Sequence, residues 1–589
     1  MEDRRTSLKR RKVLQAAAAL AASSSLGGCQ LFVRKPAPVC PDAPEVSRPG
    51  PLTIDAHCHV FNGSDLQVNG FVSRILGRQP GALGVGARAI APLLQSIGWE
   101  VAPTGAAEVK ELAALGRELA SCSSKQHQER VQELRDAAYK VGRTRLQYAL
   151  ASSAELQQLK QQPQLQGLDL ESSPVVAARL QLIAEIDGLP EEVRNYKDMR
   201  ADSGISLLAH QRSARGMLDF ILQNFQYRYV SVYDYLLTYD RPQNQRVIDL
   251  MLPSMVDYDF WLAQGGATPT SLASQVDVME AIAIATGGRV HAFVPFDPLR
   301  DVAFKLKQSS TDSFTLVTQA IEKRGCVGVK LYPPMGFAAY GNKGQREGFW
   351  KQDWLPKWAQ ETPNLGELLD SAMLKMLSWC EKNEVPVMAH TALTNGPSDE
   401  FQNLAGSQYW SQALDQVKNL RVSFGHFGDS DLGGPDAPGS ARARGFMALM
   451  GTGAQAKGRK AYADAGYFVE GLSQQPQLRA ALRELYEVST PGTAPLSTRF
   501  MYGTDWEMTL AEGRVIDGYL DNFIAVFQEM AQRPAILSQG VANLADRFFG
   551  LNAVEWVGLR AGERARERLE AFYKEHGVPK PAWARKLDA

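Results

Sequence analysis

Two histidines separated by one residue end an apolar run, Leu52–Phe61, and they constrain the fold more than any other feature of the chain. Residues i and i+2 of a β-strand point to the same face, so His57 and His59 would present two imidazoles side by side while Cys58 points the other way. Imidazole is a good ligand for zinc and related divalent ions. The motif alone leaves open whether the pair binds a metal or is only solvated or hydrogen-bonded at a strand end.

Three further candidate ligands stand at the ends of short apolar runs. The chain has only 8 histidines, and two of the others occupy such positions, as does one aspartate. The runs are Val385–His390, Leu420–His426 and Arg499–Asp505. Each follows an amphipathic helical stretch, which indicates alternating strands and helices. Imidazoles and a carboxylate gathered in this way can hold a divalent ion and leave a position for a water, whose pKa the ion lowers toward about 7.

The order of these elements predicts an α/β protein, a (β/α)₈ TIM barrel with a long helical insertion between its first and second strands. The first strand is expected within residues 52–62, the rest of the barrel within 246–560, and a C-terminal helix and tail within 561–589. The other predicted strands are Val247–Leu252, Arg289–Phe296, Cys326–Tyr332, the runs ending at His390 and His426, Tyr467–Leu472, and the run ending at Asp505. The helices expected before the later strands are Ser313–Lys323, Leu365–Glu384, Tyr409–Lys418 and Pro476–Tyr486.

Residues 63–245 contain no good pair of strands. Their composition and apolar spacing predict helices over Ala87–Leu94, Ala106–Ser121, Gln128–Leu150 and Ala177–Glu185. Connections that follow barrel strands lie on the face where active sites form, so this segment is expected to cap the metal; a scaffold or partner-docking module beside the barrel is the alternative. His127 and His210, within the segment, are expected to be surface or core residues rather than ligands.

An ordered series of short motifs resembles the amidohydrolase superfamily, and most of all its amidohydrolase-related branch, which includes the aminocarboxymuconate-semialdehyde decarboxylase type. The resemblance spans about Leu52 to Leu551, apart from the helical segment. No single motif is specific, but their order is. The motifs are Asp55-Ala56-His57-Cys58-His59, Val329-Lys330-Leu331, Ala389-His390, Gly425-His426, Gly503-Thr504-Asp505 and Asn543–Leu551.

The resemblance implies a role for each candidate residue. His57, His59, His390 and Asp505 would bind one divalent ion per chain, most often zinc. Asp505 would also orient or deprotonate the water, and His426 would polarise the substrate carbonyl or shuttle a proton. Asp55 would either orient a ligand imidazole or hydrogen-bond the backbone of its own strand.

Lys330 bears on the number of metals. In binuclear members of the superfamily, a carboxylated lysine at the end of the fourth strand bridges two ions. In the branch that this chain most resembles, a lysine in such a context can bind substrate instead. We expect one metal, with Lys330 paired to a substrate carboxylate; a binuclear site with carboxylated Lys330, or a merely solvated lysine, is the alternative.

Two long connections are expected near the site. Pro333–Pro363 is rich in aromatic residues, which would be costly to expose, so Trp350, Trp354 and their neighbours are expected to wall a substrate pocket or to pack against the helical segment. Phe427–Gly453 is rich in Gly, Asp and Pro and is typical of a mobile loop.

The N-terminus is typical of an export signal. Residues 1–29 combine Arg10-Arg11, an imperfect twin-arginine signature, with Leu26-Gly27-Gly28-Cys29, which resembles a lipoprotein cleavage box. We therefore expect a lipoprotein anchored through Cys29 and facing the periplasm, on the outer membrane because Gln30 follows the cysteine. The alternative is an uncleaved basic, amphipathic N-terminus. Residues 30–51 are rich in proline and predict a semi-rigid tether.

Composition excludes some partners and leaves others open. Lys plus Arg equals Asp plus Glu at 64 each, so nothing favours nucleic acid as a partner. No segment beyond the signal is apolar enough to span a membrane. Cysteines other than Cys29 are odd in number and lack metal-binding spacing; a disulfide such as Cys40 to Cys122 is compatible with export but cannot be assigned. Homo-oligomer formation is left open.

The function predicted from these features is a metal-dependent hydrolase. It would use a metal-activated water on a C–N or C–O bond, in an amide, lactone or ester of a small carboxylated or cyclic substrate. A metal-dependent decarboxylase on the same scaffold is the first alternative. A lipid-anchored binding module without turnover is the second, although the presence of all the candidate ligands argues against it.

Overall fold

The computed structural model describes residues 50–75, 82–119, 124–152, 220–239, 245–394, 396–428, 438–450, 460–468, 475–487, 496–512, 518–534 and 543–589, with residues 184, 186, 188, 189 and 471. Every described element belongs to Pro36–Ala589, the larger of the two units into which the chain divides. In this unit parallel strands alternate with helices, as the sequence predicts.

The strands form two parallel sheets of buried residues. One sheet pairs β1 with β2, and the other runs in the order β3-β4-β5-β6-β7-β8. Burial on both faces explains why most of these segments are apolar without alternation. The strands are β1 (Ile54–Cys58), β2 (Leu250–Pro253), β3 (Phe293–Pro295), β4 (Gly328–Leu331), β5 (Val387–His390), β6 (Val422–Gly425), β7 (Ala461–Asp464) and β8 (Phe500–Met501).

Backbone contacts connect the two sheets at both edges. Isolated parallel bridges join Met251 to Val290 and Ser254 to Phe293, between β2 and the approach to β3. At the other edge, the amide of Ala56 donates to the carbonyl of Tyr502 at 3.0 Å, and the amide of Asp505 donates to the carbonyl of His57 at 2.7 Å. These contacts bring the ends of β1 and β8 together.

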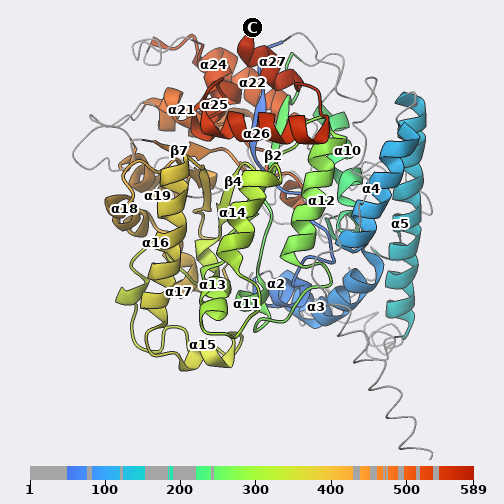
Figure 1. Ribbon diagram of the computed structural model, residues 1–589, viewed down its shortest axis with the longest axis vertical. Helices are drawn as coiled ribbons and strands as arrows, with labels where there is room; N and C mark the ends of the chain where they lie inside the picture. The colour runs from blue at the N-terminus through green and yellow to red at the C-terminus, as the bar shows by residue number, and fades with distance from the viewer. Residues whose placement is uncertain are drawn as a thin grey trace, which may run out of the picture. The chain divides into compact units, whose positions relative to one another are not determined.

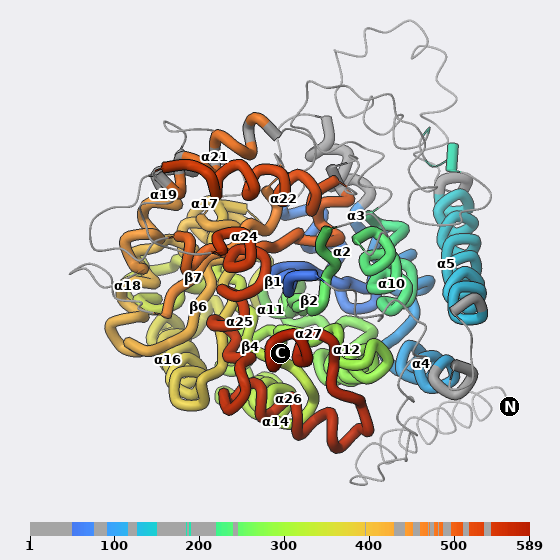
Figure 2. The backbone as a smooth tube through the Cα atoms, turned by 90° about the horizontal axis from the view of Figure 1, so that it is seen from above, coloured from blue at the N-terminus to red at the C-terminus, as the bar shows by residue number. Residues whose placement is uncertain are grey.

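Helices surround the strands (Figure 2). Several begin with a side-chain cap: at α14, for example, the carboxylate of Asp312 accepts the amide of Thr315, and the helix covers the predicted residues. The helices after β2 are α11 (Asp259–Leu262), α12 (Leu272–Ala285), α13 (Pro298–Lys305), α14 (Ser313–Lys323), α15 (Lys357–Glu361), α16 (Leu365–Asn383), α17 (Asp399–Gln402), α18 (Ser407–Gln416), α19 (Pro438–Met447), α21 (Gln475–Glu487), α22 (Tyr519–Met530) and α24 (Leu544–Asp546).

The C-terminal helices close one end of the strands. They are α25 (Asn552–Val557), α26 (Arg564–His576) and α27 (Ala582–Asp588), at the top of Figure 1. Their buried Trp556 and Trp583 belong to an apolar cluster that also contains residues of β1, β2, β3, β5, β7 and β8. Side chains from six strands therefore share one core with the C-terminal helices.

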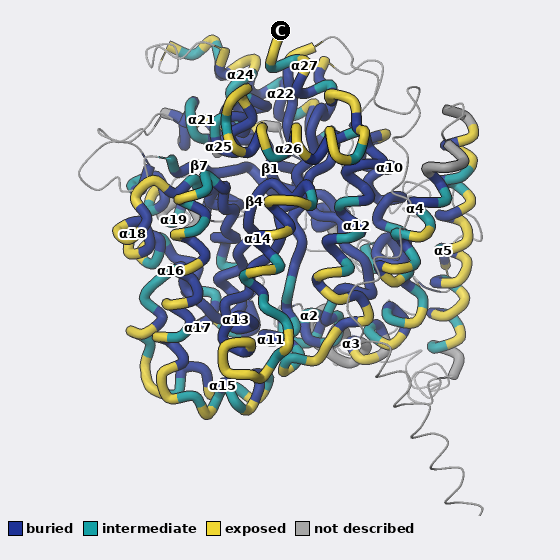
Figure 3. The backbone as a smooth tube through the Cα atoms, in the orientation of Figure 1, coloured by how far each residue is buried: buried dark blue, intermediate teal, exposed yellow. Residues whose placement is uncertain are grey.

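The described elements of the chain between β1 and β2 are all helices. Its helices are α2 (Val68–Arg74), α3 (Ala82–Val101), α4 (Gly105–Leu119), α5 (Ser124–Ser152) and α10 (Arg228–Tyr239). The predicted helices over Ala87–Leu94, Ala106–Ser121 and Gln128–Leu150 coincide with α3, α4 and α5, whereas Ala177–Glu185 lies almost entirely outside the described residues. Exposed residues run along much of α5 (Figure 3).

A buried cluster of charged side chains connects helices of this segment to one another and to the chain that follows β1. The guanidinium of Arg228, on α10, pairs with Glu108 of α4 at 2.8 Å and with Asp65, shortly after β1, at 2.6 Å. All three side chains are almost completely buried, so losing one partner would leave an uncompensated buried charge. The cluster thus fixes α4 and α10 relative to the chain that leaves β1.

The predicted seventh strand is wrong. β7 is Ala461–Asp464, which pairs with β6 and β8, and not Tyr467–Leu472. The chain turns directly after β7, where Tyr467 has a left-handed φ of 60°. Phe468 packs its ring beside that of Phe500. Ala461–Asp464 has two alanines and no β-branched residue, so β-propensity pointed to the more apolar segment that follows.

Several predictions concern residues that the structure does not describe. The export signal at residues 1–29 and nearly all of the tether at 30–51 lie outside the described ranges, as do Cys40, Cys122 and His210. Cys58, Cys326 and Cys380 are described; they are buried and form no disulfide. Within the described ranges, no helix combines the length and the apolar character needed to cross a membrane.

Candidate metal centre

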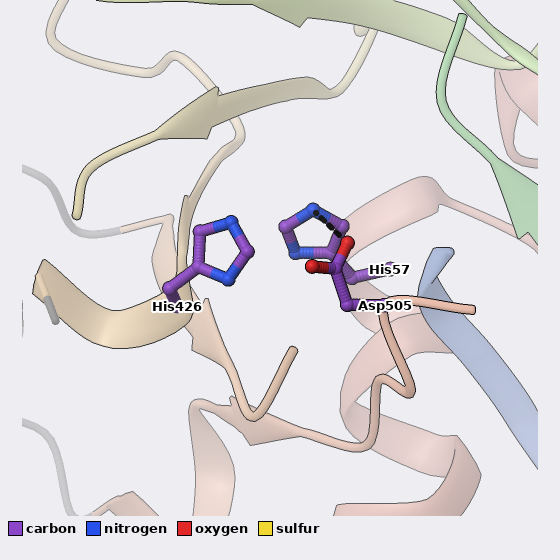
Figure 4. Close-up of side chains that lie close together, drawn as sticks. All are labelled: His57, His426 and Asp505. Carbon is purple, nitrogen blue, oxygen red and sulfur yellow. Dashed lines mark ion pairs between the residues drawn. The ribbon is translucent and has the colours of Figure 1, made fainter. Parts of the chain in front are cut away.

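Three of the predicted site residues come together at the carboxyl ends of the strands. His57 lies near the end of β1, His426 directly follows β6, and Asp505 follows β8. Each offers one ligand atom, and these atoms all lie within 4.8 Å of one another (Figure 4). The group can bind a metal ion.

The other two predicted ligands border this group. Nε2 of His59 lies 3.2 Å from Oδ1 of Asp505, and Nδ1 of His390 lies 3.0 Å from Nε2 of His426. The rings of His57 and His59 are 5.7 Å apart, so the two imidazoles do lie side by side. The geometry also places His426 among the possible ligands, although its predicted role was catalytic. Which imidazoles bind the ion stays a prediction.

Acceptors on the outer side of the centre fix the tautomers of three imidazoles. Nδ1–H of His57 donates to the carboxylate of Asp464 at 2.7 Å. Nδ1–H of His59 donates to the carbonyl of Ser254 at 2.8 Å, and Nδ1–H of His426 donates to the carbonyl of Gly466 at 2.9 Å. The Nε2 lone pair of each ring therefore faces the centre, which is how histidine is presented to a metal.

An unsatisfied carboxylate oxygen provides the test of whether a cation fits. Oδ1 of Asp505 is buried, and among the described residues no group donates a well-aligned hydrogen bond to it. It lies 3.2 Å from Nε2 of His59 and 3.8 Å from Nε2 of His57, both of them acceptors in the tautomers above. Acceptors facing one another without a proton between them repel unless a cation is shared, so the donor set fits a divalent ion.

The protonation states fit the same conclusion. Burial lowers the pKa of His57, His59 and His390, and it lowers the pKa of His426 to about 4, so all four imidazoles are neutral at pH 7. Neutral imidazoles around a carboxylate are the protonation state that metal binding requires.

Asp464 is the residue that the sequence analysis missed. It ends β7 and accepts hydrogen bonds from His57, from the hydroxyl of Ser423 at 3.0 Å and from the amide of His426 at 3.2 Å. Burial raises its pKa, but the pairing with His57 outweighs burial and lowers the pKa to about 2. The available signal was a short run ending in a carboxylate, the same pattern that identified Asp505.

Asp55 was predicted either to orient a ligand imidazole or to hydrogen-bond the backbone of its own strand, and the structure shows the second role. Its carboxylate accepts the backbone amides of His57 and Thr504, both at 3.1 Å. It also accepts the hydroxyls of Tyr235 and Thr504, both at 2.6 Å. Asp55 therefore holds β1 to the chain after β8 and to α10, whereas Asp464 orients the imidazole.

Three glycines leave room for the His57 ring. A Cβ added to Gly466 would lie 2.7 Å from Nδ1 of His57, and one added to Gly503 would lie 2.8 Å from its Cβ. A Cβ added to Gly425 would lie 2.9 Å from its Cε1. These glycines follow or end β7, β8 and β6, and they permit close approach rather than an unusual backbone conformation.

Left-handed backbone conformations also gather here. Non-glycine residues with φ between 49° and 60° are His426 and Phe427 after β6, Tyr467 after β7, and Asp505 and Glu507 after β8. Such conformations cost free energy and persist where the surrounding structure enforces them, often at functional sites. The left-handed conformations of His426 and Asp505 orient these two side chains toward the centre.

Lys330 lies inside the centre and not at the surface. It is completely buried on β4, with Nζ 2.9 Å from Nε2 of His57. Burial lowers the pKa of Lys330 to about 8, against the opposing pull of Asp464 and Asp505. Its predicted pairing with a substrate carboxylate, like the alternative of a carboxylated lysine, stays a prediction.

The aromatic residues of Pro333–Pro363 do not wall the cavity beside the centre. The described residues that line this cavity include His59, His390, His426 and Asp505 but neither Trp350 nor Trp354. Trp350 donates from Nε1 to the carbonyl of Gly336 at 2.8 Å, and the guanidinium of Arg74, on α2, lies 4.7 Å above the ring of Trp354. Trp354 thus packs against the segment between β1 and β2, the alternative given for these aromatics.

Together, these features define a parallel α/β protein with a buried imidazole and carboxylate centre at the ends of its strands. No model of a known protein family matches the sequence, and no curated protein matches it.

Solved structures do show similarity. An uncharacterized TIM-barrel protein from Bordetella bronchiseptica is 12% identical, with a TM-score of 0.32 over 56% of this chain and 82% of that one. A 2,6-dihydroxybenzoate decarboxylase from Rhizobium is 15% identical, with a TM-score of 0.28 over 53% of this chain and 84% of that one. At these scores, the activity has to be argued from the chain's own residues.

Proposed function

We propose that the protein is a metal-dependent hydrolase whose eight strands form a (β/α)₈ barrel capped by the helices between β1 and β2. It would act on a C–N or C–O bond of a small carboxylated or cyclic substrate, with one zinc ion per chain. One observation carries the proposal: the buried Oδ1 of Asp505, which lacks a well-aligned donor among the described residues, faces imidazole nitrogens whose protons are fixed on the opposite side of each ring.

The ion would be held by Asp505 with His57, His59 and His390, or with His426 in place of one of these. When bound, a divalent ion polarises a carbonyl oxygen and lowers the pKa of a water that it binds. Asp505 would also accept the proton of the attacking water. Asp464 would hold the His57 ring in place.

His426 and Lys330 would act on the substrate. Because Nδ1–H of His426 is held by the carbonyl of Gly466, only its Nε2 is available to exchange a proton with substrate. Lys330 would bind a substrate carboxylate close to His57, since its Nζ lies 2.9 Å from Nε2 of that imidazole.

A decarboxylase is the second candidate, and the composition of the cavity favours it. Most of the residues that line the cavity are apolar, among them Phe71, Phe225 and Met508. An apolar surrounding disfavours the localised charge of a substrate carboxylate more than the dispersed charge of the transition state for loss of CO₂.

Product analysis separates these candidates. The purified, metal-loaded protein would be incubated with a panel of lactones, amides and aromatic carboxylates, and both new carboxylic acids and released CO₂ would be measured. The proposal expects hydrolysis products whose formation stops on chelation. Release of CO₂ without hydrolysis would establish the second candidate, and absence of turnover despite bound metal would favour a binding module.

We also propose that the protein is an exported lipoprotein anchored through Cys29. The support is the sequence Arg10-Arg11 followed by Leu26-Gly27-Gly28-Cys29. Replacing Cys29 by Ser should move the protein out of the membrane fraction. Wild-type protein found in the cytosol with its original N-terminus would contradict this.

A further inference from the structure

The side of the cavity next to the centre consists mainly of hydrogen-bond acceptors. His59 and His426 turn the lone pair of Nε2 toward the centre, because Nδ1–H of each ring donates to a carbonyl on the outer side. Asp505 contributes a carboxylate, and all three residues line the cavity. Attack on a carbonyl or ester carbon places negative charge on a substrate oxygen, which hydrogen-bond donors stabilise. These three residues do not supply such a donor.

Most other polar side chains of the cavity wall already donate within the protein. The amides of Gln67 and Asn224 donate to a carboxylate and to backbone carbonyls, at 2.6 to 2.7 Å. Nδ1 of His390 lies 3.0 Å from Nε2 of His426 and donates to it, because that Nε2 is an acceptor. The remaining side-chain donors among the described lining residues are two phenol hydroxyls, those of Tyr258 and Tyr332.

Tyr332 holds its hydroxyl against the centre. It directly follows β4 and is 7% exposed. Its hydroxyl lies 3.3 Å from Nε2 of His59, which is an acceptor in the tautomer above, so the hydroxyl is the donor in this contact. Its ring is stacked on that of His390, with 5.5 Å between the centroids and 24° between the planes. Two imidazoles of the centre therefore fix the position of this hydroxyl.

The contact with His59 leaves the hydroxyl of Tyr332 available to a substrate. When Nε2 of His59 binds an ion, its lone pair no longer accepts the hydroxyl proton. A substrate oxygen that lies beside His59 is then within hydrogen-bonding reach of Tyr332. The ring of Tyr258 is in edge contact with that of Tyr332 at 5.3 Å, and their hydroxyls form a hydrogen bond. Hydrogen bonds in such a chain polarise one another, which strengthens the donor.

We propose that the hydroxyl of Tyr332 donates a hydrogen bond to the substrate oxygen on which negative charge develops. The inference rests on the proposed function, because the oxygen has to reach an occupied metal centre. The proton stays on Tyr332 throughout. His426 then has the other role expected for it, because its Nε2 carries a lone pair that can exchange a proton but cannot donate to a carbonyl.

Tyr332→Phe tests the proposal, because it removes the hydroxyl and keeps the ring. Two small probes are titrated calorimetrically into the zinc-loaded, full-length protein. Methylphosphonate presents anionic oxygens and should bind the variant about 10-fold to 100-fold more weakly, the usual effect of losing a hydrogen bond to a charged group. Imidazole binds zinc through its one lone pair and then offers no acceptor, so its affinity should be equal in both proteins.

Two further variants assign the effect to one hydroxyl. Tyr340→Phe is the matched control, because Tyr340 lies in the same connection but is not among the described residues that line the cavity. It should leave both affinities unchanged. Tyr258→Phe should weaken methylphosphonate less than Tyr332→Phe does, because its hydroxyl acts through that of Tyr332. A larger loss in Tyr258→Phe would overturn the assignment.

Metal content separates failure of this inference from failure of the proposed function. Equal methylphosphonate affinities in the wild type and Tyr332→Phe, or no binding to either, would overturn the inference while bound zinc leaves the metal centre standing. Loss of zinc from Tyr332→Phe would make Tyr332 a support of the centre and would also overturn the inference. A wild type that binds no divalent ion would overturn the proposed function itself.

Kinetics provide a second readout for the same variant. With a substrate from the product panel, kcat of Tyr332→Phe should fall by about 10² to 10³, the usual effect of removing one donor to a developing oxyanion. KM should be unchanged, because the hydrogen bond strengthens only as the charge develops. A rise in KM with kcat unchanged would mean that Tyr332 only binds the substrate and would overturn the inference.

Discussion

Buried histidines occur at both ends of the strands, and their partners differ. At the amino end, before β3, Nδ1 of His291 donates to the carbonyl of Gly325 at 2.8 Å, and Nε2 pairs with the hydroxyl of Tyr573 at 2.6 Å. At the carboxyl end, each of His57, His59 and His426 has one nitrogen bound to an outer acceptor and its other nitrogen turned toward a shared centre. Burial lowers the pKa of His291 to about 4, as it does for His426, so neither burial nor pKa distinguishes the two ends. What distinguishes them is where the second nitrogen points: Nε2 of His291 pairs with a single tyrosine hydroxyl, whereas each Nε2 at the carboxyl end lies among the other titratable groups of the centre.

The largest expected effect on metal binding and activity comes from removing an imidazole at the carboxyl end of the strands. His57→Ala removes the imidazole that three glycines and Asp464 hold in place, so bound metal and activity should be lost together. Elemental analysis and a turnover assay on the same preparation provide the check. Full metal content in this variant would show that His57 is not a ligand.

His426→Ala should lower turnover while metal binding is kept. We expect the ion to stay and the rate to fall by about 10² to 10⁴, because the reaction loses the imidazole that exchanges a proton with the substrate. Metal content measured beside the rate decides the role of His426. If this variant loses the ion as completely as His57→Ala, then His426 is a ligand, as its proximity to His57 and Asp505 allows.

Gly466→Ala should weaken the centre without removing a ligand. The new Cβ would lie 2.7 Å from Nδ1 of His57 and would displace the ring from Asp464. Metal affinity should fall by about 10-fold to 100-fold, the usual effect of disturbing the residues that orient a ligand. Gly344→Ala is the control, since nothing lies within 4 Å of the Cβ it would add. Equal metal affinity in the two variants would contradict the role given to the glycines.

His291→Phe should have the smallest effect on function. It leaves the hydroxyl of Tyr573 and the carbonyl of Gly325 without their partner, at a cost of about 1–3 kcal/mol in the free energy of unfolding. Denaturant unfolding should show this loss, and metal content should equal that of the wild type. Loss of metal would mean that the two ends of the strands are coupled.

The sequence predicted the centre better than the elements that support it. Strand ends such as Val387–His390 were recognisable because an apolar run stops at a polar residue of unusual chemistry. Asp464 was missed because its strand is short and rich in alanine, and the apolar residues after it resemble a strand more closely.

The composition of the cavity could not be predicted either. The segment between β1 and β2 has helical spacing, but spacing does not say which helix contacts the centre. Trp350 and Trp354 were expected either to wall the pocket or to pack against the helical segment, and the residues that line the cavity are instead others such as Phe71 and Phe225. Such contacts depend on long-range packing, which the local pattern does not encode.

Metal content tests the central claim most directly. Protein purified without added metal and without chelators, analysed by inductively coupled plasma mass spectrometry, should contain about one divalent ion per chain, and that ion should be zinc because the donors are mainly imidazole. Chelation should remove the ion, and zinc should restore it in the wild type but not in His57→Ala. Protein that carries no metal and takes up none from zinc, manganese or iron solutions would contradict the account.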